Sequence, residues 1–374
     1  MHLTPFKLER YFARHEFTAK YLLCSSDPEA MSIDDLLAYE PDAKEGFGRT
    51  WLGYTEYPGA PALREALAAQ LYTATGAAQI IVHTGAQEAI YSFMNTMFKA
   101  GDHLIVHMPG YQSHYSVASA LGISVTPWMA REEQQWSLDI DELDTLVRPE
   151  TRGLVICFPH NPTGYLPTRA QFDAIVAFAR RHDLLLFSDE VYRGLELDPR
   201  DRLPAACDVY DRAVSLGALA KSHGLAGLRI GWVATRERTV LERMSTFKDF
   251  LTISNSAPSE YLATIAVRHT DALTRRATDI TRANLDLLDA FFARHDDGFE
   301  WRRPLAGTIA FPRLKALAAY DFCERLLERT GILLLPSTLL DYGNRNFRIG
   351  FGRKNLPQIL PILDDYLATL RAAA

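Results

Sequence analysis

Short apolar runs alternate with amphipathic segments through the middle of the chain. In residues 169–180, Phe172, Ile175, Val176 and Ala179 recur at helical spacing and predict one apolar helix face. Continuous apolar runs of four to six residues are instead typical of strands that are buried on both faces. The alternation predicts βα units and a mostly parallel sheet. The apolar runs are residues 103–106, 153–158, 184–187 and 213–216.

The pattern changes after residue 260. Residues 261–294 form one long helical pattern with room for a single break. Short strand-like runs and further helical patterns follow, a mixture that is typical of a smaller α+β domain. The strand-like runs are residues 308–311, 332–335 and 347–351, and the helical patterns are residues 322–329 and 356–370.

The length of the chain agrees with this division. At about one domain per 150 residues, a chain of 374 residues has room for two domains. We expect residues 1–44 to be an N-terminal segment that lies across the domains. Residues 45–260 are expected to form the large α/β domain, and residues 261–374 the small C-terminal α+β domain.

Composition and charge narrow the class of protein. With 48% hydrophobic and 23% charged residues, the chain is an ordinary globular protein. Its net charge of −6 argues against a nucleic-acid partner. No run approaches the roughly 18 apolar residues of a membrane span, and the N-terminus lacks the apolar block of a signal peptide. We therefore expect a cytoplasmic protein without membrane contact. The four cysteines form no close pair, so neither a disulfide framework nor a metal site is expected.

A candidate phosphate site follows the apolar residues 80–82. Thr84 and Gln87 have the spacing of a capping box at the start of a helix. Between them, Gly85 and Ala86 carry no bulky side chain that would keep a ligand from the first-turn amides. A helix N-terminus of this kind attracts phosphate through its unpaired N–H groups and its dipole. A plain helix start is the alternative.

Two polar residues come directly after predicted strands. Asn161 opens an Asn-Pro-Thr-Gly sequence behind residues 155–158, and Asp189 follows residues 184–187. Ligands of α/β proteins bind at the carboxyl ends of the strands, where both side chains are expected. The alternatives are an ordinary turn at Asn161 and a helix cap at Asp189.

Lys221 lies in an unusual setting for a surface lysine. Ala218, Leu219 and Ala220 precede it, and a glycine-punctuated run follows it up to Arg229. Burial would lower the pKa of the Lys221 amine and make it nucleophilic at neutral pH. The alternative is a solvated lysine in a loop.

The order of these motifs resembles class I/II aminotransferases, which are pyridoxal-phosphate (PLP) enzymes of the aspartate aminotransferase fold. Asn161 is followed by Asp189 with Tyr192, and then by Lys221 with Arg229. Residues 54–64 resemble the family's Tyr-x4-Gly-x3-Leu-Arg element, and residues 347–352 its C-terminal arginine motif. The resemblance runs from about residue 50 to the C-terminus. It implies the α/β PLP-dependent transferase fold, in which a large domain has a mostly parallel seven-stranded sheet flanked by helices and a smaller domain is α+β.

The resemblance implies a role for each residue of the motifs. Lys221 forms the internal Schiff base with PLP and moves the substrate proton. Asp189 lies beneath the pyridine nitrogen and keeps it protonated, Asn161 and Tyr192 donate to the ring phenolate, and Tyr111 stacks on the ring. The phosphate is bound by Arg229, by Tyr54 of a second subunit and by the amides of Gly85, Ala86 and Gln87.

Two further implications concern assembly and substrate. A contribution of Tyr54 to another subunit implies a homodimer with shared sites. Arg348, together with Asn161, matches the clamp for the substrate α-carboxylate, since guanidinium binds carboxylate through two parallel bonds. Dicarboxylate specialists carry a second arginine in the stretch corresponding to residues 250–258, which holds no basic residue here. A neutral or basic substrate side chain is therefore expected, and Asp27 and Glu16 favour a basic one.

The chain departs from the family pattern at two places. Ala218 replaces a phosphate-binding Ser or Thr three residues before the lysine, and Ser222 is a candidate substitute for that hydroxyl. Near the substrate, residues 24–27 replace an N-terminal glycine. A narrower resemblance, to capreomycidine synthase-like enzymes, rests on residues 158–162, 247–252, 306–313 and 323–327.

The sequence therefore predicts a PLP-dependent aminotransferase that moves the amino group of an α-amino acid to a 2-oxo acid. The Asp189–Tyr192 motif keeps the ordinary aminotransferase pattern and ranks this activity first. The alternative enzyme is a PLP lyase or cyclase of the capreomycidine synthase type, which acts on a hydroxylated arginine. A non-catalytic PLP-fold module of a regulator is a third alternative, disfavoured because Lys221, Asp189, Tyr192 and Arg348 occur together.

Overall fold

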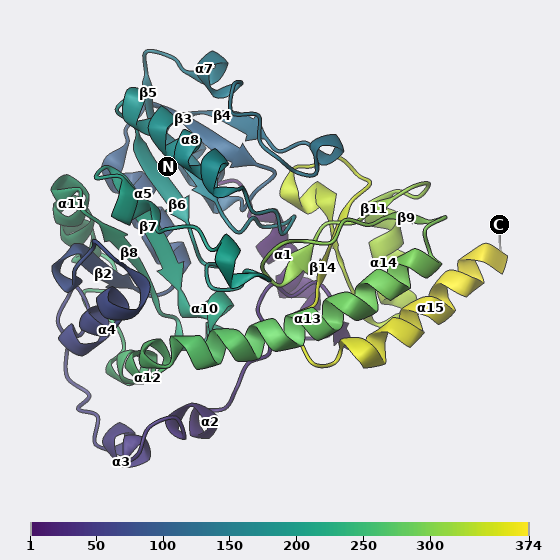
Figure 1. The fold of residues 1–374 in the computed structure, drawn as a ribbon, viewed down its shortest axis with the longest axis horizontal. Coiled ribbons are helices and arrows are strands. Elements are labelled where there is room, and N and C mark those ends of the chain that lie inside the picture. Colours follow the sequence, from purple (N-terminus) through teal and green to yellow (C-terminus); the bar gives the residue numbers. More distant parts are fainter. Residues whose placement is uncertain (1, 373–374) are drawn as a thin grey trace.

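The computed structural model describes residues 2–372 and is built around one central sheet (Figure 1). Seven strands lie in the order β2-β8-β7-β6-β5-β3-β4. All neighbours are parallel except β8, which runs antiparallel to β2 and β7. This confirms the predicted mostly parallel seven-stranded sheet. The strands are β2 (Ile80–His83), β3 (His103–Met108), β4 (Ser124–Met129), β5 (Thr151–Cys157), β6 (Leu185–Asp189), β7 (Ala213–Ala218) and β8 (Gly231–Thr235).

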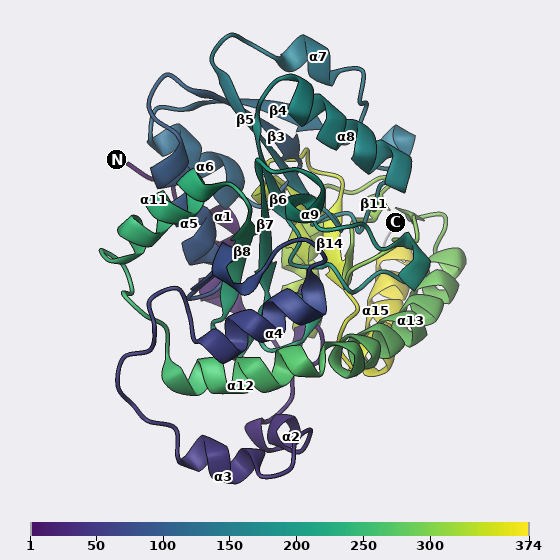
Figure 2. The ribbon, with the colours of Figure 1, turned by 60° about the vertical axis from the view of Figure 1, so that its left-hand side comes forward.

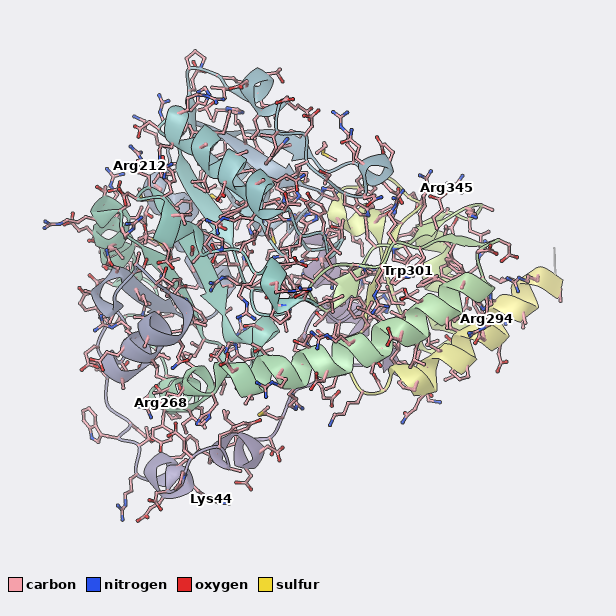
Figure 3. All side chains as sticks on the ribbon, viewed as in Figure 1. Lys44, Arg212, Arg268, Arg294, Trp301 and Arg345 are labelled. Carbon is pink, nitrogen blue, oxygen red and sulfur yellow. The ribbon has the colours of Figure 1, made fainter. Side chains whose placement is uncertain are left out.

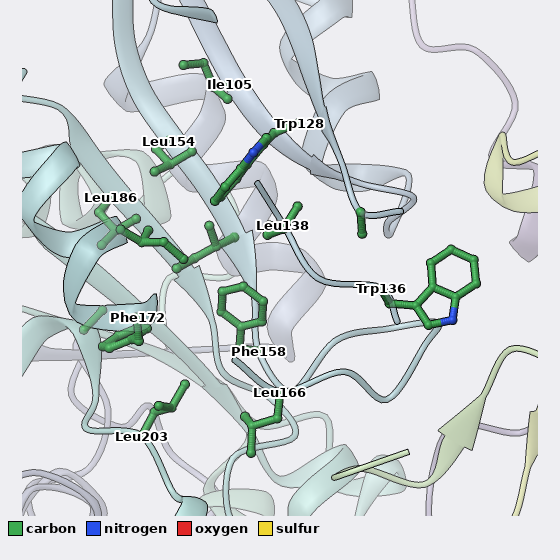
Figure 4. Close-up of a cluster of buried hydrophobic side chains, with 14 of the residues drawn as sticks. Ile105, Trp128, Trp136, Leu138, Leu154, Phe158, Leu166, Phe172, Leu186 and Leu203 are labelled. Carbon is green, nitrogen blue, oxygen red and sulfur yellow. The ribbon is translucent and has the colours of Figure 1, made fainter. Parts of the chain in front are cut away.

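Helices pack on both faces of the sheet because its central strands are apolar on both sides (Figure 2). On one face, Phe172 of α8 packs against Leu154 and Leu186 of the sheet, next to Trp128 and Phe158 (Figure 4). Helices α5, α6 and α11 cover the other face. The helices up to residue 248 are α1 (Lys7–His15), α2 (Ile33–Leu37), α3 (Ala43–Gly48), α4 (Pro61–Leu71), α5 (Ala86–Met97), α6 (Ser113–Ala120), α7 (Leu143–Leu146), α8 (Arg169–Arg181), α9 (Ala206–Val209), α10 (Leu219–Ser222) and α11 (Arg238–Lys248).

The C-terminal part is a mixture of helices and short strands, as predicted. The long helical pattern is interrupted once, at His269, which separates α12 from α13. Strands β10, β14 and β13 form a three-stranded antiparallel sheet in that order. The elements are α12 (Ala257–Arg268), α13 (Thr270–Arg294), β9 (Phe299–Glu300), β10 (Ile309–Ala310), β11 (Arg313–Leu314), α14 (Ala319–Thr330), β12 (Ile332–Leu333), β13 (Leu335–Pro336), β14 (Phe347–Gly350) and α15 (Leu356–Ala372).

The N-terminal residues contact both the sheet region and the C-terminal part. Strand β1 (Tyr21–Leu22) pairs in parallel with β12. Upstream, the Lys7 amide donates to Gln112 Oε1 at 2.9 Å, next to α6. Helix α1 lies between these two contacts and passes the carboxyl ends of the central strands. The domain boundaries after residues 44 and 260 stay predictions.

Several charged side chains, such as Lys44, Arg294 and Arg345, lie at the periphery of the molecule (Figure 3). Lys44, for example, pairs with Asp34 at 2.9 Å while both side chains are mostly exposed. Pairs of this kind contribute little to stability. Within residues 2–372, none of the helices is long and apolar enough to cross a membrane.

Candidate active site

A cavity of about 360 Å³ lies at the carboxyl ends of β5, β6 and β7. This is the edge of a parallel sheet at which α/β proteins bind ligands. The structure brings together most of the residues that the sequence singled out. Those lining the cavity are Gly85, Ala86, Gln87, Tyr111, Asn161, Asp189, Tyr192, Lys221, Arg229 and Arg348.

The first turn of α5 faces this cavity without a side-chain cap. The capping-box prediction was wrong, because Gly85 rather than Thr84 is the N-cap and the Gln87 side chain is bonded to Ser113. Gly85 has a φ of 82°, and a Cβ there would come within 2.6 Å of Arg229 Nη2. Only glycine fits this cradle, which leaves first-turn amides and a guanidinium beside one another.

Asp189 ends β6 with its carboxylate directed into the cavity. His114 Nε2, on α6, donates to Asp189 Oδ2 at 3.0 Å, and the Val191 amide donates to Oδ1 at 3.2 Å. The Asp189 side chain is buried. His114 therefore fixes the carboxylate. No local pattern points to His114, since it lies 75 residues upstream of Asp189.

Lys221 follows β7 on the short helix α10 and places its amine in the cavity. Its Nζ donates to Ser26 Oγ at 2.8 Å. Burial lowers the pKa of Lys221, while the negative charges of Asp27 and Glu9 oppose the shift. A lysine with this shift has more of the neutral, nucleophilic amine at neutral pH than a solvated lysine has.

Arg348 on β14 is buried and points toward the same cavity. Its Nε and Nη2 donate to the Cys24 carbonyl at 3.2 and 3.0 Å, and its Nη1 donates to Asn161 Oδ1 at 3.3 Å. Guanidinium has five N–H groups, so these bonds leave one on each terminal nitrogen. These two remaining N–H groups can donate to the two oxygens of a carboxylate.

The hydroxyl of Tyr192 is buried and has no hydrogen-bond partner among residues 2–372. Burial raises the pKa of this phenol, which is therefore a neutral donor. A buried polar group without a partner is costly. Because Tyr192 lines the cavity, this hydroxyl is available to an acceptor bound there, and the Ser26 side chain is close enough to lower its pKa slightly against the effect of burial.

Three carboxylates line the cavity from the N-terminal segment. Glu9 accepts from the Tyr111 hydroxyl at 3.2 Å, and Asp27 pairs with Arg353 at 2.8 Å. Burial, together with Asp27 and Glu9, raises the pKa of Glu16. The sequence pointed to Asp27 and Glu16 but not to Glu9, which α1 brings into the cavity.

Two predicted contacts are not formed within this chain. Tyr54 is 81% exposed and does not line the cavity. Ser222 is bonded to His223 Nδ1 at 2.7 Å and lines a separate small cavity, so it does not replace the hydroxyl that Ala218 lacks. Ala218 lines both cavities.

Comparison with known proteins identifies the family. The model of "Aminotransferase class I and II" matches residues 18–359. The chain belongs to this family. It is 32% identical to capreomycidine synthase of Streptomyces vinaceus, over 97% of this chain and 93% of the relative. It is 30% identical to the arginine–pyruvate transaminase of Pseudomonas aeruginosa, over 87% and 84% of the two chains.

Solved structures agree with this assignment. A PLP-dependent aminotransferase from Streptococcus suis superposes with a TM-score of 0.92 at 28% identity and covers 99% of both chains. The PLP-dependent cyclase OrfR superposes with a TM-score of 0.91 at 27% identity, covering 100% of this chain and 99% of that one. The chain therefore has the predicted PLP-dependent transferase fold and is a PLP-dependent enzyme.

The cavity fits pyridoxal 5'-phosphate in both charge and shape. The uncapped turn of α5 beside Arg229 suits a phosphate. The Asp189 carboxylate suits a protonated ring nitrogen, and the unpartnered hydroxyl of Tyr192 suits an anionic ring oxygen. Three separate features of the cavity thus match three groups of one cofactor.

Proposed function

We propose that this enzyme transfers the amino group of an α-amino acid with a basic side chain to a 2-oxo acid. The observation that carries the proposal is the convergence of three groups on one cavity. These are the Lys221 amine, the Asp189 carboxylate and the free N–H pair of Arg348. Amino transfer needs a group that carries a proton, a group that keeps the cofactor ring protonated and a group that binds the substrate carboxylate. Lys221, Asp189 and Arg348 would fill these three roles in that order.

The cofactor is proposed to be held by residues of all the elements around the cavity. Gly85, Ala86, Gln87 and Arg229 would bind its phosphate, Tyr111 would stack on its ring, and Asn161 and Tyr192 would donate to its ring oxygen. When bound, the protonated ring of PLP supplies an electron sink for negative charge at the substrate Cα. Asp189, fixed by His114, would hold the proton on the ring nitrogen.

Lys221 is proposed to attach the cofactor and, once released by the substrate, to carry the proton. Its lowered pKa leaves the amine able to accept a proton from the substrate Cα. The resulting ammonium can then return the same proton to the cofactor. Arg348 would meanwhile hold the α-carboxylate and so orient the Cα–H bond toward Lys221.

The three carboxylates of the N-terminal segment predict the substrate preference. Glu9, Glu16 and Asp27 place negative charge where the substrate side chain would lie, and residues 250–258 provide no cation for an acidic one. We expect L-arginine to exceed its neutral isostere L-citrulline by about tenfold or more in kcat/KM, because a charge-assisted contact contributes about 1.5–3 kcal/mol. Aspartate and glutamate should be slower still.

The measurement is a comparison of these donors at saturating 2-oxo acid. Glu16→Gln should narrow the arginine-to-citrulline ratio, whereas Arg348→Lys should raise KM for every donor alike. If aspartate were the fastest donor, the absence of a basic residue from residues 250–258 would not determine the substrate preference.

We also propose a homodimer with shared sites. Large exposed apolar side chains occur on two segments, residues 51–54 and residues 250–253. A hydrogen bond from Thr55 Oγ1 to the Asn255 carbonyl, at 3.4 Å, links these segments. Exposed apolar patches of this kind mark contact surfaces. Arg229 is also exposed at the cavity rim. The apolar residues are Trp51, Leu52, Tyr54, Phe250 and Ile253.

A complementation experiment checks the shared sites. Lys221→Ala and Tyr54→Arg chains should each be inactive as homodimers, and mixing them should restore part of the activity. A two-fold interface gives the heterodimer one site with both defects and one with neither. The experiment requires that Tyr54→Arg alone is inactive and that subunit exchange is verified. If no activity then returns, Tyr54 does not contribute across the interface.

The second candidate is a PLP lyase or cyclase that acts on a hydroxylated arginine. The 32% identity to capreomycidine synthase favours it, and a basic side chain would suit the same three carboxylates. The two activities differ in product. Amino transfer releases a 2-oxo acid, whereas elimination and cyclisation keep the nitrogen in the product.

A further inference from the structure

Ser26 contacts Lys221, and the proposed reaction gives this contact no role. Its hydroxyl oxygen accepts from Lys221 Nζ at 2.8 Å, and the described part of the chain offers the amine no other hydrogen-bond partner. Ser26 is 9% exposed and lines the cavity. The contact spans 195 residues of sequence, so it depends on how the N-terminal segment is held.

The backbone around Ser26 is fixed on both sides. Thr308 Oγ1 donates to the Ser26 carbonyl at 2.7 Å, and the Gly350 amide donates to the Leu23 carbonyl at 2.8 Å. Between them, the Cys24 carbonyl accepts two bonds from Arg348. Residues 23–26 therefore contact both Arg348 and the Lys221 amine, and hydrogen bonds fix the positions of three of their carbonyl groups. A hydroxyl on such a segment is pre-organised for its partner.

Strand β14 approaches this segment closely at Gly350. A Cβ on Gly350 would come within 2.1 Å of the Ser25 carbonyl oxygen. The segment thus packs directly against the backbone of the strand that carries Arg348. Main-chain packing therefore fixes the backbone that carries the Ser26 hydroxyl.

We propose that Ser26 is a positioning residue, which holds the free Lys221 amine where it takes up and returns the substrate proton. The inference rests on the proposed function. With PLP bound, the neutral Lys221 nitrogen would accept the proton as the Cα–H bond breaks, and the protonated ring would supply the sink for the electron pair of that bond. The ammonium keeps an N–H bond to Ser26 and then gives the proton up, so that Ser26 neither gains nor loses one.

Charged groups around the amine set the direction of the expected effect. Asp27 and Glu9 favour the ammonium, Arg348 and Arg229 disfavour it, and burial disfavours it most. Ser26 adds a neutral acceptor, which favours the ammonium as well. Removing the Ser26 hydroxyl should therefore lower the pH at which Lys221 becomes a free amine.

The test uses the full chain, both stripped of cofactor and loaded with it. In the stripped chain, the rate of acylation of Lys221 by acetic anhydride is followed against pH by peptide mass spectrometry. We expect Ser26→Ala to shift the midpoint to lower pH, and Ser26→Thr and Ser25→Ala to leave it near the wild-type position. In the loaded enzyme, Ser26→Ala should lower kcat by about 10–100-fold, as misplacement of a reacting group does, with KM within about twofold.

An unchanged acylation midpoint in Ser26→Ala would overturn the assignment, as would equal losses in the Ser26→Ala and Ser25→Ala variants. The midpoint does not depend on which reaction the loaded enzyme performs. A wild-type enzyme that releases no 2-oxo acid, while its Ser26→Ala midpoint shifts, would therefore overturn the proposed amino transfer and leave the Ser26 contact standing.

Discussion

Replacing Lys221 with alanine is expected to abolish turnover while the chain stays folded and still binds PLP without a covalent bond. The substitution removes both the amine that attaches the cofactor and the carrier of the substrate proton. Each of these roles supports the rate by orders of magnitude, so a loss of about a thousandfold or more is expected. The phosphate cradle at Gly85 and Arg229 lies on other elements and is left intact.

Two readouts check this expectation. The first is kcat with L-arginine and a 2-oxo acid. The second is borohydride reduction followed by peptide mapping, which should place the cofactor on Lys221 in the wild type and on no lysine in the variant. Lys44→Ala, at an exposed position, serves as the matched control. A Lys221→Ala enzyme that keeps substantial activity would refute the assignment of Lys221.

Asp189→Asn should be nearly as damaging without a change of shape. The amide oxygen can still accept from His114 Nε2, but the amide NH2 cannot accept from the Val191 N–H as Asp189 Oδ1 does. The side chain also carries no charge to keep a proton on the ring nitrogen. The electron sink is then lost, and we expect kcat to fall by about a hundredfold or more. Asp189→Glu should recover part of the rate, because it restores the charge at a slightly different place.

The measurement is kcat for the wild type, Asp189→Asn and Asp189→Glu at matched cofactor content. His114→Gln tests the hydrogen bond that His114 donates to the Asp189 carboxylate. His114→Gln keeps a donor and should cost less than Asp189→Asn. Equal rates in Asp189→Asn and in the wild type would show that the charge of Asp189 has no part in the reaction.

Features with a local signal could be predicted from the sequence. Asp189 follows an uninterrupted apolar run, so its place at the end of a buried strand is encoded nearby. The long helical pattern with a single break and the short C-terminal strands likewise follow from periodicity, although the place of the break, at His269, was not predicted. Strand β4 was not among the predicted runs, since Pro127 interrupts it, a residue tolerated there because β4 is an edge strand.

Contacts between distant segments could not be predicted. Glu9 reaches the cavity, and His114 reaches Asp189, from segments that carry no motif. Residues 24–27 were expected near the substrate, but the contact of Ser26 with Lys221 was not. The capping-box spacing at Thr84 was misleading because the positive φ of Gly85 makes glycine the N-cap instead. Spacing along the chain does not report backbone conformation of this kind.

The most direct measurement of the central claim is a single turnover with an amino acid alone. The PLP-loaded enzyme is mixed with excess L-arginine, and separately with a hydroxylated arginine, in the absence of any 2-oxo acid. Amino transfer predicts about one 2-oxo acid released per subunit, no further turnover, and recovery of the cofactor as pyridoxamine phosphate. Continued consumption of the hydroxylated arginine, with no 2-oxo acid and with the cofactor recovered as PLP, would contradict amino transfer and establish the lyase or cyclase activity instead.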